Sequence, residues 1–183
     1  ILVCLVGSEM CIRDRPRKFS DISEGINDNK LMLPIAMEGG EGIENNINNL
    51  FHFIEKGLLY FGPTWNHSLD WVSSNYDETY NSSNLKSHGL NEFGKEVINV
   101  CQENKVLIDV SHIGEKSFWD IAKISSKPII ASHSSVYNLC PHFRNLKDDQ
   151  IEEIKKTKGL LFFLFLQFDH LLNFENVGIN YKH

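Results

Sequence analysis

The stretch VLIDVSHIGEKSFWDIAKISSKPIIASHSS, residues 106–135, contains the same local pattern twice: a short apolar run that leads into Ser-His. The two apolar runs predict strands at residues 106–110 and 128–131, and the amphipathic segment between them predicts a helix at residues 115–124. Apolar strands that alternate with helices are typical of a parallel sheet covered by helices. We therefore expect both Ser-His pairs at the carboxyl edge of one parallel sheet.

The same alternation continues on both sides of this stretch. The other predicted strands lie at residues 31–37, 58–61 and 160–166. The other predicted helices lie between Ile43 and Ile54, from about Asn91 to Cys101, and from Asp148 onward. A polar segment at residues 66–89 is rich in Ser and Asn, and we expect it to be either a functional loop or a flexible insertion.

Two α/β architectures fit this alternation, an open doubly wound sheet and a closed (β/α)8 barrel of the TIM type. Polar residues that follow strands favour the barrel, because such positions converge on the rim where barrel active sites lie. These residues are Glu38, Thr64, His112 and His133. The chain has 183 residues, whereas a complete barrel needs about 250. We therefore predict a partial (β/α)8 barrel with about five of the eight strands; the family resemblance described below implies that this barrel is of the metal-dependent hydrolase type.

The first fifteen residues differ in character from the rest. They begin with ILVCLVG, which resembles a short signal core without the positively charged segment that normally precedes one. The overlapping run CLVGSEMCIRDR has no pattern expected of a strand or helix and resembles translated sequencing-adapter sequence. We therefore expect residues 1–15 to be a non-native segment, and residues 16–183 to form one incomplete barrel domain.

Composition excludes several classes of function. The formal net charge is −6 and no run is rich in Lys or Arg, so nucleic acid is not expected as a partner. The four cysteines contain no Cys-x-x-Cys pair, so they predict neither a disulfide framework nor a zinc finger. No segment reaches the roughly 20 apolar residues that a membrane helix needs. We expect no transmembrane segment in this chain.

Three side chains suited to binding a metal follow separate predicted strands: Glu38, His112 and His133. Imidazole nitrogens and carboxylate oxygens are common zinc ligands, and a barrel metal site takes its ligands from separate strand ends. Each residue also has a simpler explanation. A histidine after a strand is more often a hydrogen-bonded structural residue, and Glu38 precedes two glycines and could belong to a turn. The residues alone leave both explanations open.

Six segments occur in an order that resembles the membrane dipeptidase (renal dipeptidase) family of zinc peptidases, peptidase family M19. They are MEGGEGI, GLLYFGPTWN, HGLNEFGKEVI, VLIDVSHIGEKSFWDI, KPIIASHSS and HFRNLKDDQIEEI. The resemblance covers nearly all of residues 31–166. It implies that the complete protein is a zinc-dependent dipeptidase, in which two metal ions share the water that attacks the peptide bond of a small dipeptide.

The resemblance also implies roles for individual residues. Glu38 is expected to bridge both zinc ions and to be the catalytic carboxylate, while His112 and His133 complete the coordination of one ion. Arg144 matches the arginine that binds the substrate carboxylate, a contact that a guanidinium can make with two parallel hydrogen bonds. Trp65 stands where many relatives have a substrate-binding histidine, and it is expected to contact the substrate.

Parts of the family pattern are absent from this chain. It contains no His-x-Asp pair, which in the family binds the other zinc ion from the first strand, and it lacks the family's aspartate near the last strand. We therefore expect half of the two-zinc site to lie outside these 183 residues, and the chain to be inactive by itself. Asp109, three residues before His112, is either a support for a metal ligand or a solubility residue at a strand end.

Two other functions remain open. A related barrel amidohydrolase would also use histidines at strand ends, but it would carry a His-x-His motif on its first strand. A non-catalytic barrel remnant would explain why the His-x-Asp pair is missing. The sequence does not determine the preferred dipeptide or the assembly, for which a homodimer of the full-length protein is one expectation. The cytoplasm is the expected location, with secretion or anchoring left open.

Overall fold

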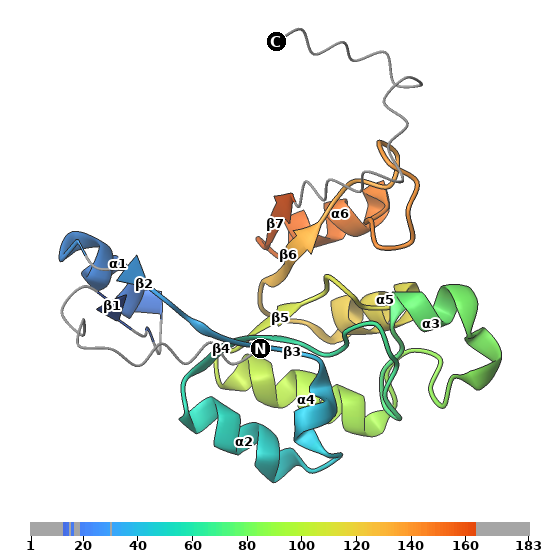
Figure 1. Cartoon of the computed structure of the whole chain (residues 1–183), viewed down its shortest axis with the longest axis horizontal. Helices are drawn as coiled ribbons and strands as arrows, with labels where there is room; N and C mark the ends of the chain where they lie inside the picture. Colours follow the sequence, from blue (N-terminus) through green and yellow to red (C-terminus); the bar gives the residue numbers. More distant parts are fainter. Residues whose placement is uncertain (1–12, 15, 17–18, 30, 164–183) are drawn as a thin grey trace, which may run out of the picture.

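The main sheet of the protein is built from five parallel strands. The structure, a computed structural model, describes residues 13–14, 16, 19–29 and 31–163. Strands that are neighbours in the sheet are also neighbours along the chain (Figure 1). In sheet order they are β3 (Ile35–Glu38), β4 (Leu58–Gly62), β5 (Leu107–Asp109), β6 (Ile129–Ser134) and β7 (Leu160–Phe163). The predicted parallel alternation is therefore confirmed.

Each crossover between these strands contains a helix, and the helices pack beside one another. They are α2 (Ile47–Glu55), α4 (Glu92–Glu103), α5 (Glu115–Ile124) and α6 (Asp148–Lys156). Helix α4 contacts α5, and α5 contacts α6. A doubly wound sheet reverses its strand order and carries helices on both faces. Sequential strands with laterally packed helices are instead the arrangement of a (β/α)8 barrel, and the prediction of a partial barrel is confirmed.

The predicted single strand at residues 31–37 is wrong in one respect, because it is divided in two. Pro34, which cannot donate a backbone hydrogen bond, lies between β2 (Leu31–Met32) and β3. Strand β2 pairs in parallel with β1 (Arg13–Asp14) in a separate two-stranded sheet. Helix α1 (Phe19–Asn27) was not predicted. In Figure 1 these blue elements lie to one side of the main sheet.

The polar segment at residues 66–89 is folded onto the barrel and contains helix α3 (Asn75–Tyr80) and the 3-10 turn η2 (Ser82–Asn84). Its backbone is tied to the loop after β5. Ser74 forms an antiparallel bridge with Ile113, and the Gly114 amide donates to the Ser73 carbonyl at 2.9 Å. Of the two alternatives for this segment, the structure favours an ordered loop, because its backbone is fastened at several points.

The core lies between the sheet and its helices. Phe61, Ile108 and Ile129 of the strands are fully buried, as are Phe118 of α5 and Cys101 of α4. The turn η1 (Gly40–Ile43) follows β3 directly and packs against α2. Among the described residues, no helix has the length and apolar character needed to cross a membrane.

Candidate metal centre

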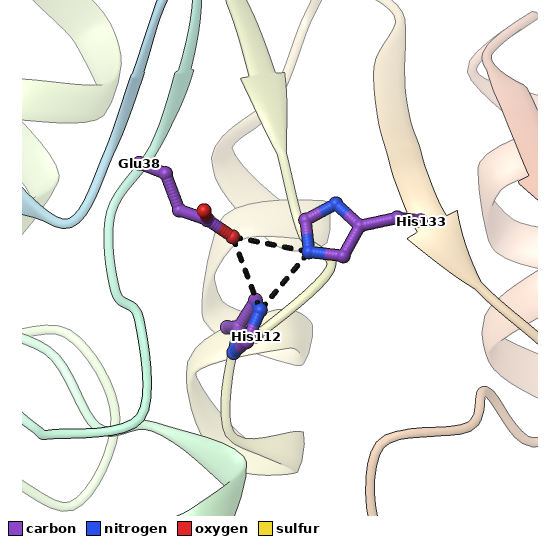
Figure 2. A group of neighbouring side chains, drawn as sticks. All are labelled: Glu38, His112 and His133. Atoms are coloured by element: carbon purple, nitrogen blue, oxygen red, sulfur yellow. Dashed lines mark hydrogen bonds and ion pairs between the residues drawn. The ribbon is translucent and has the colours of Figure 1, made fainter. Parts of the chain in front are cut away.

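Glu38, His112 and His133 converge from three different strands. Glu38 is the last residue of β3, and His112 lies three residues after β5. Strand β6 runs further than the predicted residues 128–131, so His133 lies within this strand and not after it. In Figure 2 the three side chains point toward a common centre. The sheet therefore brings together side chains that are up to 95 positions apart in the sequence, from residue 38 to residue 133.

The three ligand atoms form a nearly equilateral triangle. Glu38 Oε1 lies 3.1 Å from His112 Nε2 and 3.0 Å from His133 Nε2, and the two Nε2 atoms lie 3.0 Å apart. Tetrahedral zinc ligands with bonds of about 2.0–2.1 Å lie roughly 3.3 Å from one another. The donor set and its spacing therefore fit a zinc-sized cation after shifts of a few tenths of an ångström.

The surroundings favour, for Glu38 and His112, the protonation states that a metal requires. Hydrogen bonds from His112 and then His133 hold the pKa of the Glu38 carboxyl well below its usual value, although partial burial acts in the opposite direction. Burial lowers the pKa of His112, although Glu38 opposes this effect. An anionic carboxylate beside a neutral imidazole is the combination that zinc coordinates.

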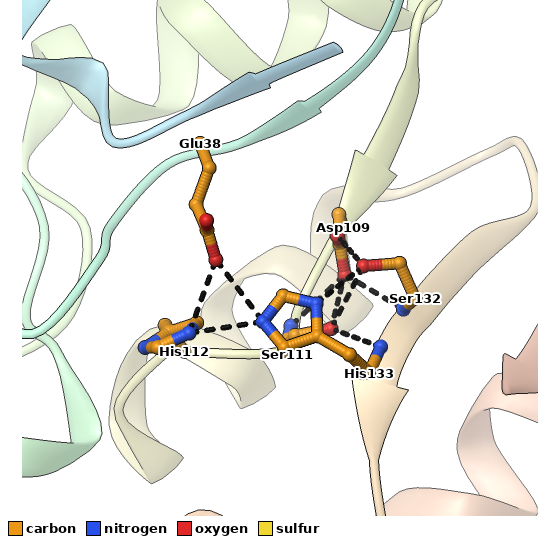
Figure 3. A network of polar contacts seen from close by, with 6 residues as sticks. All are labelled: Glu38, Asp109, Ser111, His112, Ser132 and His133. Atoms are coloured by element: carbon orange, nitrogen blue, oxygen red, sulfur yellow. Dashed lines mark hydrogen bonds and ion pairs between the residues drawn. The ribbon is translucent and has the colours of Figure 1, made fainter. Parts of the chain in front are cut away.

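Asp109 lies next to the metal centre and is only 5 % exposed. Its carboxylate accepts hydrogen bonds from Ser111 and Ser132, and Ser132 in turn contacts the His133 ring (Figure 3). This burial excludes the solubility alternative for Asp109 and leaves the supporting one. No role was predicted for the two serines from the sequence. The one sequence feature that could have indicated their role is that Ser111 and Ser132 directly precede His112 and His133.

Arg144 lies in the loop between β6 and α6, close enough to Glu38 and Asp109 for their charges to interact with it. Burial lowers its pKa to about 10, and the two carboxylates oppose this effect, so the guanidinium is charged at neutral pH. One of its nitrogens, Nη1, is buried and has no hydrogen-bond partner within the described part of the chain. The structure therefore brings a partly buried cation, with one buried and unused donor, to the metal centre.

Trp65 and Thr64 follow β4, the strand between β3 and β5 in the sheet. The Trp65 side chain is half exposed, and its ring centroid lies 6.4 Å from that of His112. Thr64 was expected at the rim, and its side chain is buried with no partner for Oγ1 among the described residues. Trp65 thus borders the metal centre and remains accessible from solvent.

Asn75 connects the turn that carries His112 to the loop that carries Arg144. Its backbone amide donates to the His112 carbonyl at 3.0 Å, and its Nδ2 donates to the Phe143 carbonyl at 3.3 Å. Asn75 lies in the polar segment at residues 66–89, and the sequence analysis assigned it no role. No local pattern reveals such a role, because both partners are distant in sequence.

A segment of parallel barrel with two histidines and a carboxylate at the ends of its strands is characteristic of barrel metal-dependent hydrolases. The chain belongs to the membrane dipeptidase family, peptidase family M19, whose family model matches residues 11–176. The resemblance stated from the sequence segments is therefore confirmed. The matched range begins inside residues 1–15 without showing whether they are native, so the non-native origin of that segment stays a prediction.

Two curated bacterial proteins are similar to this chain in sequence. An uncharacterized protein in the PQQ-III 3′ region of Acinetobacter calcoaceticus is 37% identical over 141 residues, which are 77% of this chain and 44% of the relative. An uncharacterized protein in the pqqA 5′ region of Klebsiella pneumoniae is 32% identical over 142 residues, covering 78% of this chain and 52% of the relative. The chain thus spans about half the length of the curated relatives it matches.

A solved structure supports the same fold. The crystal structure of a metallopeptidase from Rhodobacter sphaeroides, liganded with a phosphinate mimic of the dipeptide L-Ala-D-Ala, superposes with a TM-score of 0.77 at 26% identity. The superposition covers 86% of this chain and 45% of that protein. The described strands and helices therefore correspond to a large part of a metallopeptidase fold.

Proposed function

We propose that the complete protein hydrolyses the peptide bond of small dipeptides with the help of two zinc ions. The observation that supports this most strongly is the triangle of Glu38, His112 and His133, which offers one carboxylate oxygen and two imidazole nitrogens to a single cation. Membership of the membrane dipeptidase family supports the type of reaction. The dipeptide mimic bound to the similar metallopeptidase supports the class of substrate.

The metal ligands have distinct tasks in this proposal. His112 and His133 would hold one ion through their imidazole nitrogens, and Glu38 would contribute the negative charge of the triangle. The second carboxylate oxygen of Glu38 is not part of the triangle, so Glu38 would have an oxygen left for a second ion. When bound, two such ions polarise a peptide carbonyl and lower the pKa of a water toward neutrality.

Arg144 and Trp65 are proposed to hold the substrate. A partly buried guanidinium with an unused donor can bind the carboxylate of a dipeptide, and the low local dielectric strengthens that pair. The half-exposed Trp65 ring beside His112 offers an apolar wall. Together they orient the peptide bond toward the metal centre. The remaining ligands, a His-x-Asp pair and an aspartate, are proposed to come from outside these 183 residues.

Replacing the ligands in the complete protein tests this function. Glu38→Gln and His133→Ala are expected to reduce dipeptide turnover at least 1000-fold, on the order of other losses of essential catalytic groups, and to lower the zinc content. Glu55→Gln and His52→Ala change exposed residues of α2 and serve as matched controls with normal turnover. Unchanged zinc content in both ligand variants would contradict the assignments.

The two alternatives are separated by the substrate and by the gene. An amidohydrolase of another kind would hydrolyse lactones or cyclic amides faster than dipeptides, and a non-catalytic remnant would hydrolyse none of them. The two-zinc proposal also requires the gene to encode a His-x-Asp pair at the end of an apolar strand upstream of β3. An intact gene without that pair would exclude the two-zinc site.

A further inference from the structure

The Asp109 carboxylate is saturated with hydrogen-bond donors. Its Oδ1 accepts from the Ser111 amide at 3.1 Å, from Ser111 Oγ at 2.6 Å and from the Ser132 amide at 3.0 Å. Its Oδ2 accepts from Ser132 Oγ. A carboxylate has only acceptor atoms, so each serine must direct its single hydroxyl proton toward Asp109. The side chain thereby fixes the direction of two hydroxyl groups (Figure 3).

The direction of these hydroxyl protons determines how His133 is held. Ser132 Oγ lies 2.7 Å from His133 Nδ1. Because its proton is given to Asp109, the Ser132 oxygen is left as an acceptor, and Nδ1 must carry the proton that it accepts. Ser111 acts on the backbone in the same way, because its Oγ accepts from the His133 amide at 3.0 Å. Asp109 therefore acts on His133 through both serines.

We propose that Asp109 and Ser132 are positioning residues that keep a proton on His133 Nδ1. Nε2 is then the nitrogen left for a divalent cation: it lies 3.0 Å from both Glu38 Oε1 and His112 Nε2, and a proton that it shares with Glu38 in the metal-free protein is the one that the cation displaces. The inference rests on the metal site of the proposed function, but not on dipeptidase activity. In metal sites, partners of this kind orient the ring and fix its tautomer, and their loss weakens metal binding by about 10- to 100-fold.

His112 provides a contrast within the same site. Its buried Nδ1 has no hydrogen-bond partner in the described part of the chain, so no comparable chain of donors sets its tautomer. The two ligand histidines are therefore held differently, although both follow a serine. Changes to the Asp109 network should alter the tautomer of His133 and leave the ring of His112 unaffected.

The isosteric variant Asp109→Asn gives the sharpest test. Three donors converge on Oδ1, so the amide oxygen of the new side chain should occupy that position and its amide nitrogen should face Ser132 Oγ. Ser132 would then accept from this amide nitrogen and turn its own proton toward His133 Nδ1. His133 Nδ1 should then accept a proton instead of carrying one, so the single proton of the ring stays on Nε2 and blocks the metal. This prediction differs from that of a merely structural role, which would leave the tautomer unchanged.

The experiment uses the complete protein, freed of metal and with nitrogen-15-labelled histidine. Ring-nitrogen chemical shifts of the metal-free protein should show a proton on His133 Nδ1 in the wild type and none on Nδ1 in Asp109→Asn. Titration with Co²⁺ should show about 10- to 100-fold weaker binding in Asp109→Asn and Ser132→Ala, with an altered visible spectrum. Ser132→Thr keeps the hydroxyl and should restore binding to within about threefold of the wild type.

Ser134→Ala is the matched control, because Ser134 lies in the same strand and its buried Oγ has no partner among the described residues. It should bind Co²⁺ like the wild type. Absence of a proton on Nδ1 of wild-type His133, or a proton kept on Nδ1 in Asp109→Asn, would overturn the inference. If Asp109→Asn does not fold, wild-type Co²⁺ affinity in Ser132→Ala would overturn it. Since the tautomer is measured without metal, this readout decides the inference even if the proposed function fails.

Discussion

Glu38 supplies the only negative charge in the ligand triangle, because its two partners are imidazole rings. A cation held by two neutral nitrogens and one carboxylate loses much of its electrostatic stabilisation without that charge. The same carboxylate also interacts favourably with both rings when no metal is bound. Glu38 therefore influences two measurable properties, metal affinity and the dependence of stability on pH.

The pKa of Glu38 predicts how stability changes in acid. The usual value is 4.5, and the hydrogen bonds from His112 and His133 hold the folded-state value below it. The stabilisation is therefore present above about pH 4.5 and is lost as the pH falls toward the folded-state value. Urea unfolding of the metal-free chain should show a larger loss of stability between about pH 6 and pH 3.5 in the wild type than in Glu38→Gln. Equal losses would contradict the pKa assignment.

Arg144 predicts an effect on substrate binding. In the complete protein, Arg144→Ala should raise KM for a dipeptide about 100-fold, since a charge-assisted bidentate contact is removed. Arg144→Lys should recover part of the loss, because an ammonium group keeps the charge but cannot form two parallel hydrogen bonds. Steady-state kinetics provide the measurement. A dipeptide amide, which lacks the carboxylate, should be affected little by either variant, and an equal effect on both substrates would reject this role.

Sequence reasoning at the residue scale singled out candidate ligands and Asp109 as a candidate support, but not the two serines. Glu38, His112 and His133 were singled out because metal ligands are restricted to a few side chains and because the surrounding segments resemble a family. The network of Ser111 and Ser132 depends on the pairing of β5 with β6, in which Asp109 lies opposite Ile130. The register between two strands depends on tertiary structure, so the sequence alone did not predict that Ser111 and Ser132 would bind Asp109.

At the scale of elements, apolar runs and helical spacing predicted the five main strands and the helices between them. These predictions succeeded because each helix or strand buries one face, so its apolar residues recur with the period of that helix or strand. The prediction failed where the boundary depends on a single residue or where the segment is polar. Pro34 divided one predicted strand, and α3 lies in a segment whose order comes from contacts with the loop after β5.

We predict that replacing Gly94 of α4 with alanine lowers the stability of the protein, although this substitution usually raises it in a helix. An alanine in the middle of a helix normally stabilises relative to glycine by about 1 kcal/mol. Here a Cβ atom would lie 2.5 Å from the Trp71 backbone oxygen, so Gly94→Ala should destabilise by about 1–3 kcal/mol. Gly42→Ala, whose Cβ would have ordinary contacts of 3.5 Å or more, is the control. Urea unfolding measures both, and a more stable Gly94→Ala would refute this close approach.

At the scale of the whole molecule, the described sheet has two open edges, β3 and β7. Leu160 and Phe162 of β7 are more than half exposed, and unpaired strand edges promote association. The 183-residue chain is therefore expected to self-associate in light-scattering measurements and to show negligible dipeptidase activity. Robust zinc-dependent hydrolysis of dipeptides by this chain would contradict the proposal that half of the site lies elsewhere.

The position of the zinc ions in the complete protein is the decisive observation for the proposed metal centre. Crystals of the complete protein with zinc should be measured at the zinc absorption edge. We predict an anomalous peak within about 2.0–2.2 Å of Glu38, His112 Nε2 and His133 Nε2, and a second peak on the other oxygen of Glu38. Zinc bound without these three side chains, or a zinc-loaded active enzyme with no peak between them, would contradict the proposal.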